Sequence, residues 1–454
     1  MTSAASRPRP ARRAIDDLSL TVDADLLDRF ATDEPDWLTA DRRAAFDAYT
    51  ALPAESNLLY TPYIDLRAAQ LEAASVVVEA STGTSGSGSL PADTDGVIEL
   101  SDGRLTALAL SDAASGASVR LASLLDDVDR YRDALTGSTA PAADDKFAQL
   151  TRALWSRGVV VDVPAGVTLE RPIVIRWAQG EPGRASFTRT LVRLGDGASA
   201  TVVEEFVPAP GADPTAAQSL FAGTMEVQLG TGADLQVASL QELPPNVVAI
   251  EHRAADIGEG AKLQWALAQL GGRLVRTRVD NRLVGDRSTV RQVEIVFGSD
   301  EQLFDLTSYT THIGKDTTGD LLSKAALLER SRTYLKGLIT IDKSANGTDS
   351  FLGEFGMNLS KAARSVAIPS LEIDQPDCRR AAHSSSVGPI DETQLFYLES
   401  RGIPPDEARK FIVLGFLEPV VARVPLASAR DRLRELLEEK WAAGTDGVTG
   451  EAAA

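Results

Sequence analysis

The chain has 454 residues, 43% hydrophobic and 24% charged, which is typical of a globular protein rather than of a disordered or fibrous one. Its formal net charge of −19 disfavours nucleic acid and anionic membrane surfaces as partners, because both repel an acidic protein. No apolar run reaches the roughly 18 residues of a membrane span, no hydrophobic leader is visible, and the single cysteine excludes an internal disulfide, so we expect a cytoplasmic protein.

The first region, residues 1–96, is expected to be helical and to end in a linker. An acidic, proline-containing helix start at 33–35 precedes apolar residues that recur at helical spacing as far as Leu52. Residues 81–96 are rich in glycine and serine, which is typical of a flexible linker. Residues 97–157 mix short strand and helix signals and form an entry segment to the central region.

Over residues 158–388 the pattern changes to short runs of alternating apolar residues, separated by turns that contain glycine. One such turn recurs with its flanking residues. Its first glycine stands at positions 195, 230, 258 and, in a weaker copy, 285, which are 35, 28 and 27 residues apart. Recurrence at this period without an intervening helix indicates stacked coils, in which each glycine is expected to permit a positive φ at a corner. A β-sandwich also has short strands, but it would not explain the recurring turn.

The last region, residues 389–454, is expected to be helical again. A helix over 392–400 is stopped by Gly402, and a second begins at the prolines and acids of 404–407. A third, over 426–441, carries its apolar residues on one stripe.

The boundary between the strands and these helices carries the most specific pattern in the chain. Seventeen positions of mixed chemistry follow one signature: His383, Val387-Gly388, Asp391-Glu392, Leu395 to Leu398, Ser400 to Gly402, Asp406 to Ala408 and Gly415-Phe416. This pattern resembles the C-terminal signature of the SufB/SufD family, the scaffold proteins of bacterial and archaeal iron–sulfur cluster assembly. Similar stretches at 158–175, 335–351 and 368–373 extend the resemblance over about residues 150–440.

The resemblance implies a mainly β fold, with a right-handed parallel β-helix core flanked by N-terminal and C-terminal helical regions. It implies a non-catalytic scaffold subunit of a SufB–SufC–SufD complex, in which motion of the SufC ATPase drives cluster formation at the SufB–SufD interface. The partners would be a SufC-type ATPase and a SufB-type scaffold, and the cargo a transient iron–sulfur cluster. We expect no cofactor to be bound stably by the chain alone. Whether reduced flavin binds in the complex, and whether the isolated chain forms a homodimer, stay open.

Residue by residue, the resemblance assigns His383 to the cluster-assembly interface and makes it a candidate metal ligand, since imidazole can hold Fe(II) at neutral pH. His252 and His312 are expected to be structural. In the family the C-terminal helical region docks the ATPase. The candidate ATPase-binding residues there are Leu395, Phe396, Leu398, Arg401 and Phe416.

The cysteine content favours the SufD-type subunit. Thiolates are the usual ligands of iron–sulfur clusters, and one cysteine cannot hold a cluster alone. Cys378 lies five residues before His383, whereas many family members have cysteine two residues before it, where this chain has Ala381. We therefore interpret Cys378 as a small turn residue.

Two alternatives stay open at this point. A SufB-type cluster scaffold would belong to the same family, and a β-solenoid carbohydrate-active enzyme would belong to another class. The chain has no Walker A sequence and no His-Glu-x-x-His, Cys-x-x-Cys or Gly-x-Ser-x-Gly motif, so we expect no ATPase or other enzymatic activity from it alone.

Overall fold

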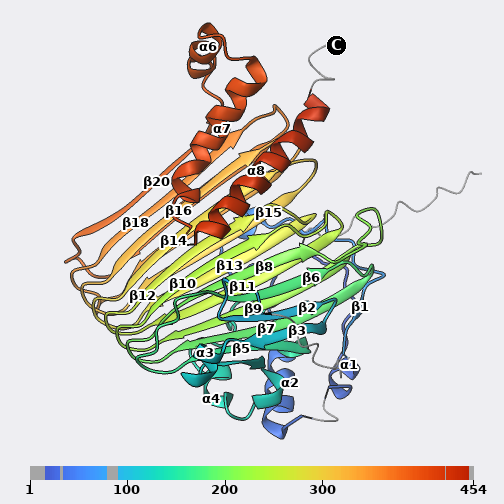
Figure 1. Cartoon of the computed structure of the whole chain (residues 1–454), viewed down its shortest axis with the longest axis vertical. Helices are drawn as coiled ribbons and strands as arrows, with labels where there is room; N and C mark the ends of the chain where they lie inside the picture. Colours follow the sequence, from blue (N-terminus) through green and yellow to red (C-terminus); the bar gives the residue numbers. More distant parts are fainter. Residues whose placement is uncertain (1–15, 31–33, 79–89, 425, 449–454) are drawn as a thin grey trace, which may run out of the picture.

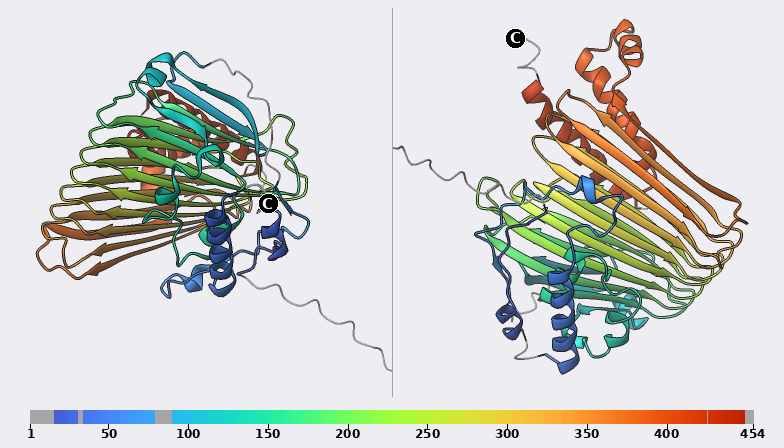
Figure 2. Two further views of the ribbon diagram at one scale, coloured as in Figure 1. Left: turned by 90° about the horizontal axis from the view of Figure 1, so that it is seen from below. Right: turned by 180° about the vertical axis from the view of Figure 1, so that it is seen from behind.

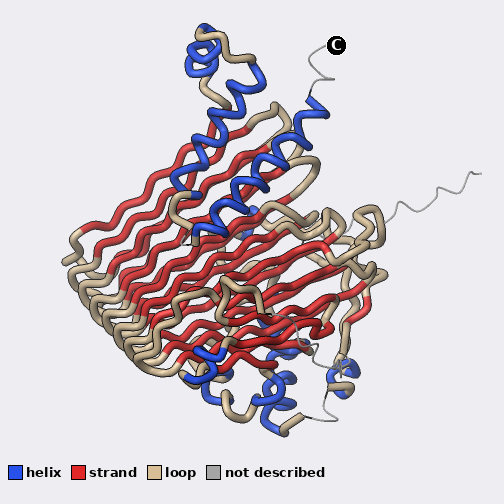
Figure 3. Tube along the Cα trace, viewed as in Figure 1, coloured by secondary structure: helices blue, strands red, loops and turns tan. Residues whose placement is uncertain are grey.

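The computed structural model describes residues 16–30, 34–78, 90–424 and 426–448. Its core is a parallel β-solenoid of about eight coils (Figures 1 and 3). Successive strands alternate between two facing sheets, and each pairs in parallel with the strand two positions further along the chain. The predicted mainly β solenoid, flanked by helices at both ends of the chain, is therefore confirmed.

Sheet A is built from the odd-numbered strands β5 (Arg157–Val163), β7 (Arg184–Leu194), β9 (Ser219–Leu229), β11 (Val247–Ile257), β13 (Leu274–Leu283), β15 (Leu303–His312), β17 (Arg332–Ile341) and β19 (Arg364–Ile373). Sheet B is built from the even-numbered strands β6 (Ile173–Gln179), β8 (Ser199–Pro208), β10 (Asp234–Gln241), β12 (Lys262–Gln269), β14 (Thr289–Gly298), β16 (Thr318–Leu327), β18 (Asp349–Asn358) and β20 (Arg380–Pro389).

The first coils are covered by short elements of the entry segment. A hairpin adds to sheet B, and a short antiparallel strand adds to sheet A beside β5. These elements are β2 (Gly96–Ser101), β3 (Arg104–Leu110), α3 (Asp112–Gly116), β4 (Arg120–Ser123), η2 (Leu125–Asp127), α4 (Arg132–Leu135) and α5 (Lys146–Leu154). The linker expected at 81–96 falls mostly on residues 79–89, which lie outside the described part of the chain.

The N-terminal segment lies on the outer face of sheet A (Figure 2). It contains α1 (Asp25–Asp28), α2 (Asp36–Ala51), η1 (Thr61–Tyr63) and β1 (Ser75–Val76). The predicted helix after the acidic start is α2, and it packs on α5. Among the described residues, no helix is long and apolar enough to cross a membrane.

The recurring turns stack as predicted. The strands after the four turns begin in register, with Asp234 opposite both Ser199 and Lys262, and Lys262 opposite Thr289. The prediction that each glycine of a turn has a positive φ is wrong in one detail. Only the second glycine of a turn has one, as at Gly197 with +65°. The first glycine is needed for close stacking instead.

Three apolar layers hold the molecule together. One fills the solenoid between the two sheets and contains buried residues such as Trp265 and Val296. A second joins the outer face of sheet A to the N-terminal segment and α5. The third joins the outer face of sheet B to the C-terminal helices α7 (Pro405–Val421) and α8 (Ala427–Val448), and it contains Leu240 and Leu433. Both sheets are therefore buried on two faces over much of their area, which explains their near-continuous apolar strands.

Candidate functional site: the open end and the C-terminal helices

The last coil of the solenoid ends in two unpaired strand edges. Within the described chain, β19 pairs only with β17, and β20 pairs only with β18. Each of these edge strands is 10 residues long, so each presents a long row of backbone N–H and C=O groups. Such an edge is a template for pairing with another chain.

His383 lies on β20, at this open end. It is in register with Leu352 of β18, which belongs to an apolar cluster in the solenoid interior. Side chains on one face of a sheet share this register, so His383 also faces the interior side, at its mouth. The side chain of His383 is exposed, and neither ring nitrogen has a hydrogen-bond partner in the described chain. An exposed imidazole without a partner is available to a ligand that enters from beyond the last coil.

The other two histidines are buried and bonded. His252 contacts Asp280 at 2.9 Å between Nε2 and Oδ2. His312 contacts the hydroxyls of Thr317 and Ser350 at 2.8 and 3.0 Å, and burial lowers its pKa to about 4. His252 therefore joins the neighbouring strands β11 and β13, and His312 joins β15 to β18 of the facing sheet, in agreement with their expected structural role.

Cys378 precedes β20 and is half-buried against the same interior cluster that Ala381 contacts. The only cysteine and His383 thus lie on the same last coil. Among the described residues there is no group of three or more His, Cys, Asp and Glu side chains arranged to hold a metal ion.

A column of mostly polar side chains, interrupted by Leu267, runs through the interior towards the open end, and no sequence pattern predicted it. One inward-facing position per coil of sheet B forms this column: Glu204, Ser239, Leu267, Glu294, Ser323, Glu354 and Ser385. The only sequence signal for this column is a glutamate at a strand position where the alternation calls for an apolar residue. That signal can be recognised only once the strand register is known.

The carboxyl groups of this column differ in their ion-pair and hydrogen-bond partners. Glu204 contacts the guanidinium group of Arg253 at 2.7 Å. Glu294 accepts a hydrogen bond from Ser323 at 2.9 Å, and burial raises its pKa to about 7. Glu354 accepts one from the backbone N–H of Ile368 at 2.9 Å, and burial raises its pKa to about 8. The two carboxyl groups of the column nearest to the coil that carries His383 therefore both have raised pKa values.

The second candidate surface is the C-terminal helical projection, formed by α6 (Glu392–Ser400) and the adjoining first part of α7. Figure 1 shows α6 standing clear of the solenoid, while the rest of α7 lies along sheet B. Asp391 caps α6 by accepting a hydrogen bond from Thr393 N at 2.8 Å, and Gly402 ends the turn after it with a φ of +84°. The predicted helix over 392–400 is thus confirmed.

The five residues predicted to bind the ATPase do not share one surface. Phe396 is 71% exposed, and Arg401 is exposed with its guanidinium group over a neighbouring tyrosine ring. Leu395 is buried and Leu398 half-buried. Phe416 is half-buried beneath Lys324 of β16, whose ammonium lies 4.5 Å from the ring centre.

Two further aromatic residues belong to the exposed part of the projection. Tyr397 is 56% exposed and Phe411, on the first turns of α7, is 54% exposed. With Phe396 they form the exposed aromatic set of the projection. Exposed aromatic residues are enriched at protein interfaces. The sequence contained their helical positions, but the orientation of the two helices decided their exposure.

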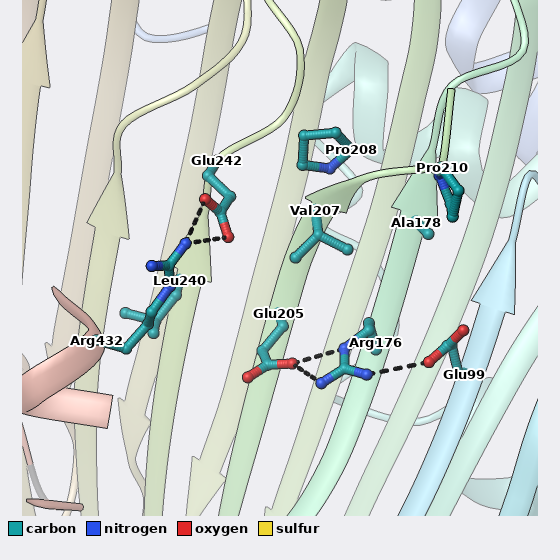
Figure 4. A pocket seen from close by; sticks show the side chains of 10 residues that line it. All are labelled: Glu99, Arg176, Ala178, Glu205, Val207, Pro208, Pro210, Leu240, Glu242 and Arg432. Carbon is teal, nitrogen blue, oxygen red and sulfur yellow. Dashed lines mark hydrogen bonds and ion pairs between the residues drawn. The ribbon is translucent and has the colours of Figure 1, made fainter. Parts of the chain in front are cut away.

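A cavity of about 420 Å³ lies on the outer face of sheet B beside α8 (Figure 4). Its charged groups already satisfy one another. Arg176 bridges Glu99 and Glu205 at 3.1 and 2.7 Å, and Arg432 of α8 contacts Glu242 at 3.1 Å. The Arg432 pair attaches α8 to the sheet, and both guanidinium groups of the cavity are paired, so this cavity is a weak candidate for a ligand site.

An open solenoid end and a projecting aromatic helix pair are features of a protein that contacts other chains. Comparison with known proteins agrees. Residues 176–416 match the family described as SUF system FeS cluster assembly, SufBD core domain. The chain therefore belongs to the SufBD family, as the resemblance predicted. This membership favours an assembly scaffold over the carbohydrate-active enzyme.

Individual relatives give the same result. The chain is 29% identical over 298 residues to the iron-sulfur cluster assembly protein SufD of Bacillus subtilis, which covers 65% of this chain and 67% of that protein. It is 28% identical over 292 residues to an iron-sulfur cluster assembly SufBD family protein of Staphylococcus epidermidis, covering 64% of this chain and 62% of the relative. A Staphylococcus aureus protein of the same description matches to the same extent. The chain thus matches about two thirds of the length of these relatives.

Proposed function

We propose that this protein is a SufD-type, non-enzymatic scaffold subunit of an iron–sulfur cluster assembly complex with a SufB-type scaffold and a SufC-type ATPase. The observation that carries the proposal is the unpaired last coil with His383 exposed on it. The B. subtilis SufD relative and the single cysteine support the SufD-type rather than the SufB-type subunit.

In this proposal the SufB-type subunit pairs with the free edges of β19 and β20. The two solenoids then share extended sheets, and the interior face of β20 becomes part of a common interface. His383 would lie in that interface as a ligand for iron during assembly, with the remaining ligands supplied by the partner and by sulfide. The cluster is cargo, and the chain alone holds none.

The ATPase is assigned to the C-terminal helical projection. The exposed aromatic set of α6 and α7 supplies the apolar anchor, and Arg401 supplies a polar contact at its rim. Because α7 continues onto sheet B, where Lys324 also donates a hydrogen bond to the carbonyl of Phe416 at 2.6 Å, movement of the projection is transmitted directly to β16. ATP-dependent motion of the ATPase would in this way open or close the interface at the last coil.

Co-expression with a SufB-type and a SufC-type protein, followed by size-exclusion chromatography, tests the assignment. We expect a three-component complex with the unaltered chain. Val387→Lys, on the exposed interior face of β20, should release only the SufB-type subunit, and Phe396→Ser should weaken only ATPase binding. Failure of the unaltered chain to bind either protein, or full binding of both by both variants, would refute the proposal.

A further inference from the structure

Seven large apolar side chains of the described chain are strongly exposed, and they fall in three places. Phe396, Tyr397 and Phe411 belong to the helical projection, and Ile373 and Val387 to the open strands β19 and β20. The remaining two are Leu58, 86% exposed, and Leu59, 54% exposed, in a turn of the N-terminal segment. The first two places have a proposed partner, and the third has none.

This turn lies against the outer face of sheet A and reaches its last strands. Before the turn, Glu55 contacts Arg276 of β13 at 3.1 Å and Lys336 of β17 at 3.6 Å. After it, the rings of Tyr63 and Tyr334 lie 5.9 Å apart, again on β17. The right-hand view of Figure 2 shows the segment in blue, extending over the strands of the late coils.

The turn itself is well held. The side-chain oxygen of Asn57 accepts a hydrogen bond from Leu59 N at 3.0 Å, and its carbonyl accepts one from Tyr60 N at 2.9 Å. Tyr60 is fully buried, with its ring 6.2 Å from that of Tyr309 and its hydroxyl close to Ser370 of β19. Buried anchors on both sides thus fix two leucines in solvent, immediately beside the open edge.

We propose that Leu58 and Leu59 form a second contact with the SufB-type subunit, next to the pairing of β19 and β20. This inference rests on the proposed function and extends it to a surface outside the solenoid edges. A subunit that pairs with the edge of β19 extends sheet A, so its own outer face lies next to the turn, which is anchored at Ser370 of β19. The ATPase is a poor candidate for this contact, because α7 and α8 lie over sheet B, on the opposite face of the solenoid (Figures 1 and 2).

The partner surface that fits is an apolar one. The two leucines carry no charge, and burying both removes a large apolar area from water. The contact zone would then have three parts. The edges of β19 and β20 pair through their backbones, Ile373 and Val387 provide apolar contacts on those strands, and the two leucines provide them on the outer face of sheet A. Contacts on two sides of the paired edges would fix the angle between the two solenoids. Strand pairing alone does not fix it, because the twist between paired strands varies.

The test compares Leu58→Ser/Leu59→Ser with Phe411→Ser in the complete complex, because both replace exposed apolar groups by serine. We expect the double variant to bind the SufB-type subunit at least tenfold more weakly, with unchanged ATPase affinity. Phe411→Ser should show the reverse. Circular dichroism and thermal unfolding should be unaltered in both, since the replaced groups are in solvent.

Val387→Lys separates this inference from the function on which it rests. If Val387→Lys releases the SufB-type subunit while the leucine variant binds it at full affinity, the second contact is wrong and the proposed function stands. If neither variant changes binding, the proposed function fails as well. Leu58→Cys with a photoreactive label, in a Cys378→Ser background, gives an independent result. The label should cross-link to the SufB-type subunit, and exclusive cross-linking to the ATPase, or none at all, would overturn the assignment.

Discussion

Glu354 and Ile368 are joined across the solenoid interior, where the carboxylate from sheet B accepts a hydrogen bond from the backbone N–H of β19 at 2.9 Å. Gly337 of β17 makes room for the carboxyl group, since a Cβ built there would lie 2.7 Å from its Oε1. The carboxyl group is buried without an ion-pair partner in the described chain, and a charge there is costly. The coil next to His383 is therefore held by a group whose charge depends on pH.

This relationship predicts a pH dependence of stability. The pKa of Glu354 rises from 4.5 when unfolded to about 8 in the fold, so between these values the folded chain binds the extra proton. The protonated carboxyl group therefore stabilises the fold at low pH, and this contribution to the free energy of unfolding is lost progressively as pH rises through the window. The folding equilibrium constant changes by up to tenfold per pH unit. Glu354→Gln should remove that part of the decline between pH 5 and 8, as measured by urea unfolding.

Other groups titrate as well, so the comparison between variants is what matters. The pKa of Glu294, the nearest buried carboxyl in the column, is raised in the same direction, to about 7. Desolvation lowers the pKa of half-buried Lys440 to about 7, which makes stability rise with pH above that value. Glu399→Gln on exposed α6 is the matched control and should parallel the unaltered chain. A parallel pH profile for Glu354→Gln would contradict the assigned pKa.

His383→Ala should leave folding and complex assembly intact and strongly reduce iron–sulfur enzyme maturation in a strain that lacks the native gene. The side chain is exposed and bonded to nothing described, so its loss should cost within about 0.5 kcal/mol. The measurement is the activity of an iron–sulfur enzyme in the complemented strain. His252→Ala is the control, because its lost contact with Asp280 should destabilise the protein by about 1–3 kcal/mol. Normal maturation with His383→Ala would end the role assigned to it.

Phe396→Ser should weaken ATPase binding by tenfold or more without changing thermal stability, because the ring is 71% exposed. Affinity measured by calorimetry against the purified ATPase gives the result. Deleting residues 391–454 would be a poorer experiment, since it would uncover the apolar face of sheet B around Leu240. Phe416→Ala is the informative contrast. Its ring packs on Lys324, so we expect a loss of stability before a loss of binding, and the opposite order would show that Phe416 contacts the ATPase directly.

Arg276→Met should loosen the N-terminal segment. The guanidinium group is buried between Asp305 at 2.6 Å and Glu55 at 3.1 Å, and its removal leaves two carboxylates facing one lysine. Breaking a buried pair in this way costs roughly 3–5 kcal/mol. Denaturant unfolding and limited proteolysis near residue 55 measure the effect.

The control is Arg273→Met, which removes a half-exposed contact with Glu301 at 3.2 Å. Exposed pairs contribute up to about 1 kcal/mol, so this variant should differ little from the unaltered chain. Equal effects of the two arginine variants would show that the segment is not anchored through Arg276.

Gly285→Ala tests the stacking of the recurring turns. A Cβ at Gly285 would lie 2.0 Å from the backbone nitrogen of Glu259 in the preceding turn, so the coils must separate. We expect a loss of roughly 1–3 kcal/mol in thermal or urea unfolding. Gly116→Ala, with no atom within 4 Å, should be neutral or slightly stabilising. An unchanged stability for Gly285→Ala would mean that the turns are not closely stacked.

The sequence by itself determined the local structure and its repetition. The turns around Gly195, Gly230 and Gly258 and the alternating strands predicted a solenoid, because turn chemistry and side-chain alternation are properties of neighbouring residues. The caps of α6, Asp391 and Gly402, fixed its ends in the same way. The family signature added the identity of the scaffold class.

The tertiary structure alone decided which residues meet across long separations. The column from Glu204 to Ser385 exists only because successive coils stack in one register, and the sequence spacing between coils is irregular. The turn at Leu58 is held on the late strands of sheet A by contacts such as that of Glu55 with Arg276, 221 positions further along the chain. The candidate ATPase residues divided between surface and interior because the crossing of α6, α7 and sheet B, which no local pattern encodes, determines the contacts of each helical face.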